Sequence, residues 1–177
     1  MPDLMTHLAT THLLRRTWEC TQGKEFTPRH AASLYVGGCL PDFISRMPGV
    51  VTGLLHTAGL ISRDTFINCQ YILESLHAPV PVAIAAYLLA LLLPEIGRSR
   101  NFMLLAMAST LHFILDGLQT TLGVSSGALL FPFSWTSWHL NLFWPDQAIL
   151  SLPWLGAVIV ILELLRRRRK SACEISP

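Results

Sequence analysis

Two side chains that can bind a metal ion lie four positions apart in an apolar stretch of the sequence. His112 and Asp116 belong to the segment LHFILDGL, and residues at i and i+4 of a helix share one face. An imidazole and a carboxylate on one face can hold the same ion. Ionisable residues are costly inside an apolar membrane helix, so this pair is a functional candidate. Alternatively, His112 forms hydrogen bonds within a helical bundle and Asp116 lies among lipid headgroups.

Three more residues extend this pattern upstream. Glu74 and His77 are three positions apart, which is the Glu-x-x-His spacing of metal-binding helical bundles. They could equally form a surface pair. Asp42 directly follows Pro41, which we expect to end a helix and to present the carboxylate just beyond it. An Asp after a proline can also be a simple turn residue.

His7 is the candidate nearest the N-terminus. His12 lies about 140° further round the same predicted helix and closer to its cytoplasmic end, so we prefer His7. The chain has no glycine-rich phosphate loop and no G-x-S-x-G motif, and its four cysteines form no C-x-x-C pair. The candidate chemistry is therefore that of metal ions and carboxylates. Histidine and aspartate together favour zinc, or another divalent transition metal, over magnesium.

The composition is that of a membrane protein. Of 177 residues, 51% are hydrophobic and only 14% are charged, and the mean hydropathy is +0.46. Soluble domains carry about 25% charged residues, so this chain could not cover a water-facing surface. The net charge is +2, and the basic run Arg166 to Lys170 follows an apolar stretch. We therefore expect the lipid bilayer as a partner and no nucleic acid.

The elements that must position these residues are helices. We predict an all-α, polytopic membrane bundle with three long transmembrane helices, two shorter N-terminal helices and one amphipathic helix on the membrane surface. The long helices are expected at Val80–Ile96, Phe102–Leu118 and Ala148–Leu165, the short ones at Thr6–Trp18 and His30–Leu40, and the amphipathic one within residues 60–78.

These elements form one membrane-embedded domain over residues 1–177. Its predicted parts are a short helix hairpin (1–47), an outer-face segment (48–79), a helix hairpin (80–118), an aromatic outer loop (119–147), and the last membrane helix with its basic tail (148–177). Within the aromatic loop, Gly123–Pro145 fits an interfacial aromatic belt. It could also cover a pocket for an acyl chain.

The positive charges predict an orientation. Most of them gather on alternate links of the chain, and the positive-inside rule places those links in the cytoplasm. They are Arg15, Arg16, Lys24, Arg29, Arg98, Arg100 and Arg166 to Lys170, whereas Arg46 and Arg63 fall on the other side. The C-terminal tail is then cytoplasmic. The same zigzag collects most of the His and Asp residues at the outer face, although no charge rule requires this.

Four short motifs occur in a recognisable order: MTH at 5–7, GGCLPD at 37–42, SLHAP at 75–79, and LHFILDGLQTTLGV followed by LLFPFSW over 111–135. In this respect the chain resembles the YdjM-like family of inner-membrane-associated, metal-dependent hydrolases. The resemblance covers roughly residues 5–135. A fainter likeness, at the level of fold, is to zinc-dependent phospholipase C and P1 nuclease.

The resemblance implies a bacterial inner-membrane location and a set of metal ligands, namely His7, Asp42, His77, His112 and Asp116. The sequence departs from the family in one motif, where Ile72 stands at the position of an upstream histidine and Ala78 follows His77. The family pattern therefore lacks one ligand here, and Glu74 is a candidate to replace it.

These observations together predict a membrane-bound, metal-dependent hydrolase. A bound divalent metal would activate water, and zinc is the preferred candidate. Asp116 or Glu74 would act as general base. A site at the outer face indicates a phosphoester of a lipid or lipid-linked substrate. The alternative is a non-catalytic membrane protein: a metal-binding, transport or structural subunit whose polar residues hold helices together.

Overall fold

Helices make up the regular structure in the part of the chain that the structure describes. The computed structural model describes residues 2–120, 130–136, 139–144 and 146–174. The elements are α1 (Pro2–Gln22), α2 (Pro28–Thr57), α3 (Arg63–Ser75), α4 (Pro79–Leu91), α5 (Arg98–Leu118), the 3-10 helix η1 (Gln147–Ser151) and α6 (Leu152–Glu174). The predicted all-α fold is confirmed, but the two N-terminal helices expected to be short are 21 and 30 residues long.

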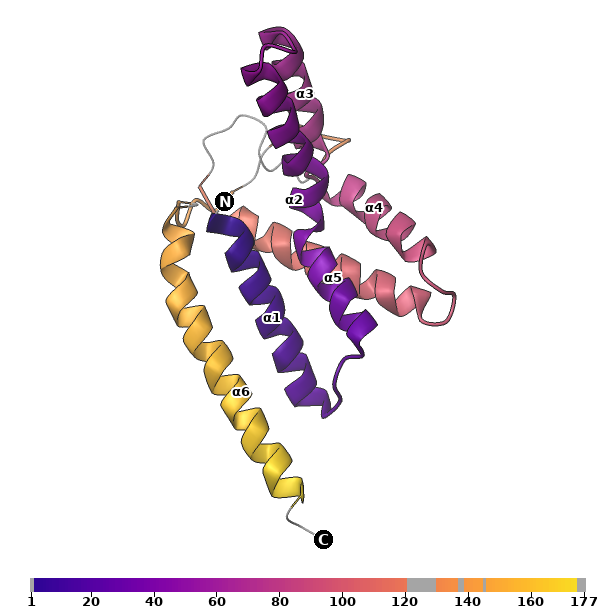
Figure 1. Ribbon diagram of the computed structural model, residues 1–177, viewed down its shortest axis with the longest axis vertical. Coiled ribbons are helices and arrows are strands. Elements are labelled where there is room, and N and C mark those ends of the chain that lie inside the picture. The colour runs from indigo at the N-terminus through magenta and orange to yellow at the C-terminus, as the bar shows by residue number, and fades with distance from the viewer. Residues whose placement is uncertain (1, 121–129, 137–138, 145, 175–177) are drawn as a thin grey trace.

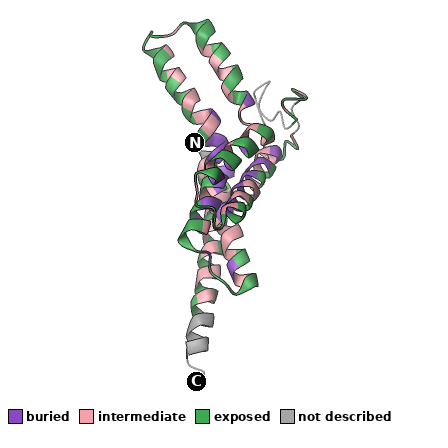
Figure 2. Cartoon of the chain, turned by 90° about the vertical axis from the view of Figure 1, so that its right-hand side faces the viewer, coloured by how far each residue is buried: buried purple, intermediate pink, exposed green. Residues whose placement is uncertain are grey.

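The long helix α2 joins two parts of the molecule (Figure 1). Its first half packs against α1 and α5, and its second half leaves them to form an antiparallel hairpin with α3. Helix α4 folds back along α5, and α6 lies against α1, to which the Arg16–Glu163 ion pair (2.5 Å) connects it. Figure 2 shows that the buried residues gather in the middle of the molecule, whereas the hairpin arms are mostly exposed or half-buried.

The expectation that Pro41 ends the second helix was wrong. Helix α2 continues through Pro41 and Pro48 to Thr57, so Asp42 lies inside the helix. A proline has no N–H, and in a helix it leaves the carbonyl four residues earlier without its usual donor. Here that carbonyl belongs to Gly37, and it accepts a hydrogen bond (2.8 Å) from the hydroxyl of Ser109 on α5. The neighbouring helix thus supplies the missing donor.

The helix predicted within residues 60–78 is confirmed as α3. Ser62 caps its N-terminus by accepting a hydrogen bond from the Thr65 N–H. Helix α3 packs along the second half of α2, where the Gln70 amide donates to the Gly49 carbonyl (3.2 Å). Its position on a membrane surface stays a prediction.

Two helices of the described chain are long and apolar enough to cross a membrane: Arg98–Leu118, and Gln147–Arg167 from η1 into α6. The segment predicted at Val80–Ile96 is shorter as a helix, because α4 ends at Leu91 after 13 residues. At the 1.5 Å rise of a helix it spans about 20 Å, less than the apolar core of a bilayer. It counts as a third crossing only if joined to α3 across a bend of 72°. The protein therefore has two or three candidate spans.

Glycine allows α2 to lie very close to its neighbours. A methyl group at Gly37 would lie 2.4 Å from the Leu105 carbonyl oxygen of α5, and one at Gly38 would lie 2.5 Å from Thr11 Oγ1 of α1. Small residues at such crossings are typical of helices packed in membranes. The close approach brings the side chains of α1, α2 and α5 together in the buried middle of the bundle.

Candidate metal centre

Five side chains from four parts of the sequence come together in one cluster. His7 comes from α1, Asp42 from α2, His77 from the link before α4, and His112 and Asp116 from α5. Asp116 Oδ1 lies 3.1 Å from His7 Nε2. Its other oxygen, Oδ2, lies 2.7 Å from Nε2 of His77 and 3.2 Å from Nε2 of His112. Three imidazoles therefore direct the same ring atom at one carboxylate.

Asp42 completes the cluster from the side of α2. Its Oδ1 lies 3.8 Å from His112 Nε2 and 3.9 Å from His77 Nδ1. The described side chains form two groups able to hold a metal: His7, His112 and Asp116 in one, and Asp42, His77 and His112 in the other. His112 belongs to both, so the groups are parts of one centre.

The environment of His112 decides which of its nitrogens can bind an ion. Nδ1 lies 2.8 Å from the Gly38 carbonyl oxygen, which can only accept a hydrogen bond, so Nδ1 carries the hydrogen. Nε2 is buried and makes no hydrogen bond to any residue that the structure describes. A histidine that ligates a metal is usually held in this way through its other nitrogen. His112 therefore offers one nitrogen, Nε2, to the centre.

A serine does the same for His77. The Ser45 hydroxyl donates to the Pro41 carbonyl (2.7 Å), so its oxygen accepts from His77 Nδ1 (3.0 Å). The lone pair of His77 then resides on Nε2, which faces Asp116 Oδ2. Two imidazole lone pairs and an anionic oxygen repel one another unless a proton or a metal ion lies among them. This donor set fits a divalent transition metal.

The imidazoles are also stacked. The rings of His7 and His112 lie 3.7 Å apart between centroids and are nearly parallel. The side chains of His7 and His112 are 0% exposed, whereas those of His77 and Asp116 are 15% and 18% exposed. The centre is therefore closed on the side of α1 and open on the side of His77 and Asp116.

Arg46 is a residue of this site that the sequence analysis did not find. Its Nε lies 2.9 Å from Asp42 Oδ1, and its side chain is 39% exposed. The pair is an i,i+4 contact, which appears only because α2 continues through Pro41. One hint was present in the sequence: Arg46 is one of two positive residues that the predicted topology places away from the cytoplasmic links. The structure thus adds a cation at the edge of the centre.

The other candidates lie outside the cluster. His12 was set aside in favour of His7, and it bonds to the hydroxyl of Tyr35 (2.5 Å) instead. Glu74 is exposed at the end of α3 and belongs to neither metal-binding group of the described residues. Its role as a general base stays a prediction. Ile72 is 64% exposed on the same helix and is not part of the centre.

Part of the aromatic loop lies outside the described residues, namely 121–129, 137–138 and 145. In the described portion, Phe133, Trp135 and Trp144 are exposed, which is compatible with a belt. The backbone around Leu140 returns to the end of α5, where its N–H donates to the Gly117 carbonyl (2.8 Å). The loop therefore lies beside the centre.

No protein-family model, no curated protein and no solved structure matches this chain. The resemblance to the YdjM-like family stays a prediction.

Proposed function

We propose that the chain is a membrane-bound, metal-dependent hydrolase of the YdjM-like kind. One observation carries the proposal: His77 and His112 have their Nδ1 atoms occupied by fixed acceptors, and their Nε2 atoms converge on Asp116 Oδ2. In this tautomer two imidazole lone pairs and a carboxylate oxygen face one another, an arrangement that a bound divalent cation would stabilise. Second contacts that fix the ligating histidines in this way accompany metal binding in proteins.

The centre would hold a single ion. His112 belongs to both ligand groups and has one nitrogen to give, so it cannot bind two ions at once. His7, His77 and His112 would supply nitrogen, and Asp42 and Asp116 would supply oxygen. Zinc is the first choice for this set of ligands.

A bound zinc ion would lower the pKa of a water molecule to about 7 and polarise the bond to be cleaved. The protein's own part is to hold and move protons. Asp116 is the carboxylate on the open side of the centre, so it can take a proton from a water molecule entering there. Arg46 places a positive charge at the same edge as Asp42, where it would attract an anionic group. A phosphoester of a lipid or lipid-linked molecule fits this edge.

The proposed location is the bacterial inner membrane, with the centre toward the outer face and the C-terminal tail in the cytoplasm. Three contacts support one orientation for the whole bundle. Arg16 pairs with Glu163 in the middle of α6, Arg166 pairs with Glu25 in the link after α1, and His30 lies next to Gly97 at the start of α5. The basic links therefore lie at one end of the bundle, whereas the N-terminal end of α1, which carries His7, lies at the other (Figure 1).

Metal content tests this proposal first. We expect near-stoichiometric zinc, manganese or iron in the detergent-purified protein, measured by mass spectrometry, and its loss in the His112→Ala/Asp116→Ala variant. His12→Ala is the matched control, because it removes a histidine of α1 that bonds to Tyr35 outside the centre. All three proteins should elute as single species in size-exclusion chromatography. A folded wild type that contains no metal would overturn the proposal.

Turnover separates the hydrolase from its alternative. One consideration favours a non-catalytic metal protein: if all five side chains bound the ion, no position would remain for water, as in structural metal sites, whereas the hydrolase requires that fewer of them bind it. The hydrolase predicts cleavage of bis(4-nitrophenyl) phosphate that a chelator abolishes and added zinc restores. A fully metallated protein without such turnover would support the metal-binding or structural alternative.

A further inference from the structure

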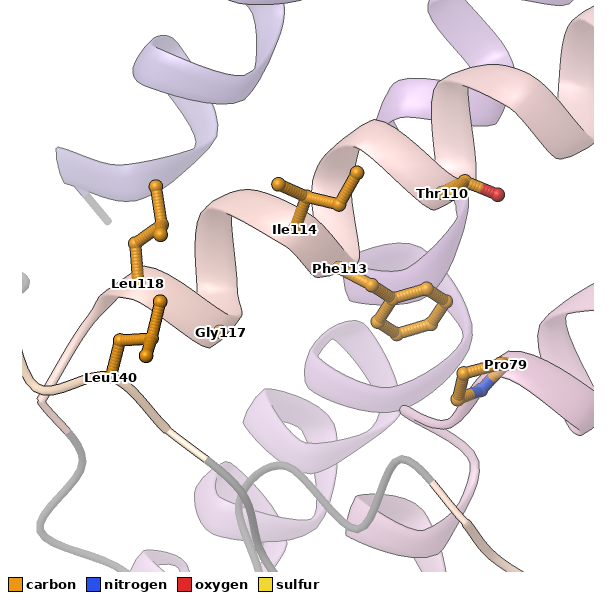
Figure 3. Close-up of a pocket in the computed structure, with 7 residues that line it drawn as sticks. All are labelled: Pro79, Thr110, Phe113, Ile114, Gly117, Leu118 and Leu140. Carbon is orange, nitrogen blue, oxygen red and sulfur yellow. The ribbon is translucent and has the colours of Figure 1, made fainter.

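An apolar groove adjoins the metal centre on the outside of α5 (Figure 3). Its volume is about 440 Å³, within the range of about 300–1,000 Å³ that is typical of small-molecule sites. A smaller cavity of about 170 Å³ between α4 and α5 shares Pro79, Thr110 and Phe113 with it. The two cavities therefore lie next to each other on α5.

The groove and the centre share a wall. Phe113 lines the groove, and its ring packs edge-on against the imidazoles of His77 (5.5 Å) and His112 (5.9 Å). Two other lining residues, Pro79 and Gly117, are close neighbours in sequence of His77 and Asp116. A molecule lying in the groove would therefore be next to the proposed metal ligands.

The groove is lined almost wholly by hydrocarbon. Its one hydroxyl belongs to Thr110, which donates to the Ala106 carbonyl of its own helix (2.9 Å). Ile114 on the rim is 56% exposed. If the candidate span α5 crosses the bilayer, this exposed rim would face the lipid phase, and a lipid could enter sideways without leaving the bilayer.

We propose that the groove holds the hydrocarbon chain of a lipid phosphate whose phosphate group lies at the metal centre near Arg46. The inference rests on the proposed function and names the shape of its substrate. A cation that pairs with Asp42 of the centre, and an apolar groove that shares the Phe113 wall with His77 and His112, match the two ends of such an amphiphile. In moving from the bilayer into the groove, the hydrocarbon chain of the lipid would exchange one apolar environment for another and would gain little binding energy. The groove would instead orient the phosphate at the metal centre.

Site-specific photolabelling tests the groove. The probe is dodecyl phosphate with a diazirine in its chain, added to the full chain in phosphatidylcholine nanodiscs, and labelled peptides are identified by mass spectrometry. We expect labelling over residues 110–118 of α5. Ile114→Trp fills the groove and should abolish that labelling.

A second apolar groove on the same molecule provides the control. It lies between α2 and α4, has a volume of about 530 Å³ and includes Leu88, whose 55% exposure matches that of Ile114. Leu88→Trp should leave the labelling of α5 unchanged. The uncharged probe, dodecanol with the same diazirine, should label both grooves alike, because it has no phosphate to direct it.

The outcomes separate this inference from the proposed function. Equal labelling of both grooves by the phosphate probe, or labelling of α5 that persists in Ile114→Trp, would overturn the groove assignment while leaving a metallated wild type as a hydrolase. Metal content is measured on the same samples. A wild type without metal would remove the proposed function, and with it the phosphate end of this inference.

Discussion

Ser45 acts on the centre only through His77. Its hydroxyl lies between the Pro41 carbonyl and His77 Nδ1, and it is 4% exposed. It therefore holds the imidazole in the tautomer that leaves Nε2 available. The Gly38 carbonyl does the same for His112. Both acceptors come from the part of α2 around Pro41, so one irregular stretch of helix orients two of the proposed ligands.

Ser45→Ala should weaken metal binding without removing a ligand. Loss of such an outer contact typically lowers metal affinity about 10–100-fold. Competition of the purified protein with a zinc chelator measures the change.

Ser75→Ala is the matched control for this substitution, because Ser75 is also buried but its hydroxyl donates to the Ile72 carbonyl of its own helix. Equal zinc affinity in the Ser45→Ala variant and the wild type would show that Ser45 does not position His77.

At the level of elements, the contact of α2 with α5 positions the centre. Gly37 lies against the backbone of Leu105, and Ser109 donates to the Gly37 carbonyl that Pro41 leaves without a helical partner. His112 lies one turn beyond Ser109 and reaches the next carbonyl, that of Gly38. The same crossing therefore stabilises the irregular helix and brings Asp42 toward His112.

Gly37→Ala should destabilise the protein. Its new methyl group would lie 2.4 Å from the Leu105 carbonyl oxygen, and backbone atoms of a packed helix cannot move aside cheaply. Overpacking of this kind costs about 1–3 kcal/mol, which should lower the thermal midpoint in detergent by several degrees.

Gly53→Ala on the same helix is the control. There the nearest atom to the new methyl would be a ring carbon of Phe66 at 3.9 Å, an ordinary contact. Alanine favours a helix over glycine by about 1 kcal/mol, so this variant should be as stable as the wild type or more so. Equal destabilisation by both substitutions would contradict the close crossing of α2 and α5.

The whole molecule has a polar end and a basic end. The centre lies near the start of α1 and the end of α5, and the links with Lys24, Arg29 and Arg98 lie toward the other ends of these helices. In the candidate span of η1 and α6, only 6% of the residues are buried. That helix contacts the rest mainly through α1, so most of its apolar surface is left to face lipid.

The proposed orientation predicts how two turns react with a membrane-impermeant maleimide. In a cysteine-free background, Thr57→Cys at the tip of the hairpin of α2 and α3 should be labelled in intact bacterial cells whose outer membrane admits the reagent. Lys24→Cys in the link after α1 should be labelled only after the inner membrane is permeabilised. Both positions are exposed, so the comparison reports sidedness. The reverse pattern would invert the orientation.

Local properties of the sequence were enough to predict an all-α fold with apolar helices, although not the lengths of α1, α2 and α4. Together with the family resemblance, they named five residues that the structure brings together. Hydropathy and helical spacing depend on neighbouring residues only, so both can be recognised in the sequence without knowledge of the fold. The spacing of His112 and Asp116 was sufficient to place both on one face of α5. Of the two histidines of α1, His7 lies in the cluster, whereas His12 bonds to Tyr35 outside it.

Only the tertiary structure decided how α2 passes Pro41. Proline normally interrupts a helix, so the sequence alone predicts that the helix ends at Pro41. The donor that lets the helix continue is Ser109, which lies 72 positions away from Gly37 in the sequence. The roles of Arg46 and Ser45 follow from that continuation, as does the place of Asp42 inside the helix. No periodic pattern in the sequence indicates a hydrogen bond between residues so far apart.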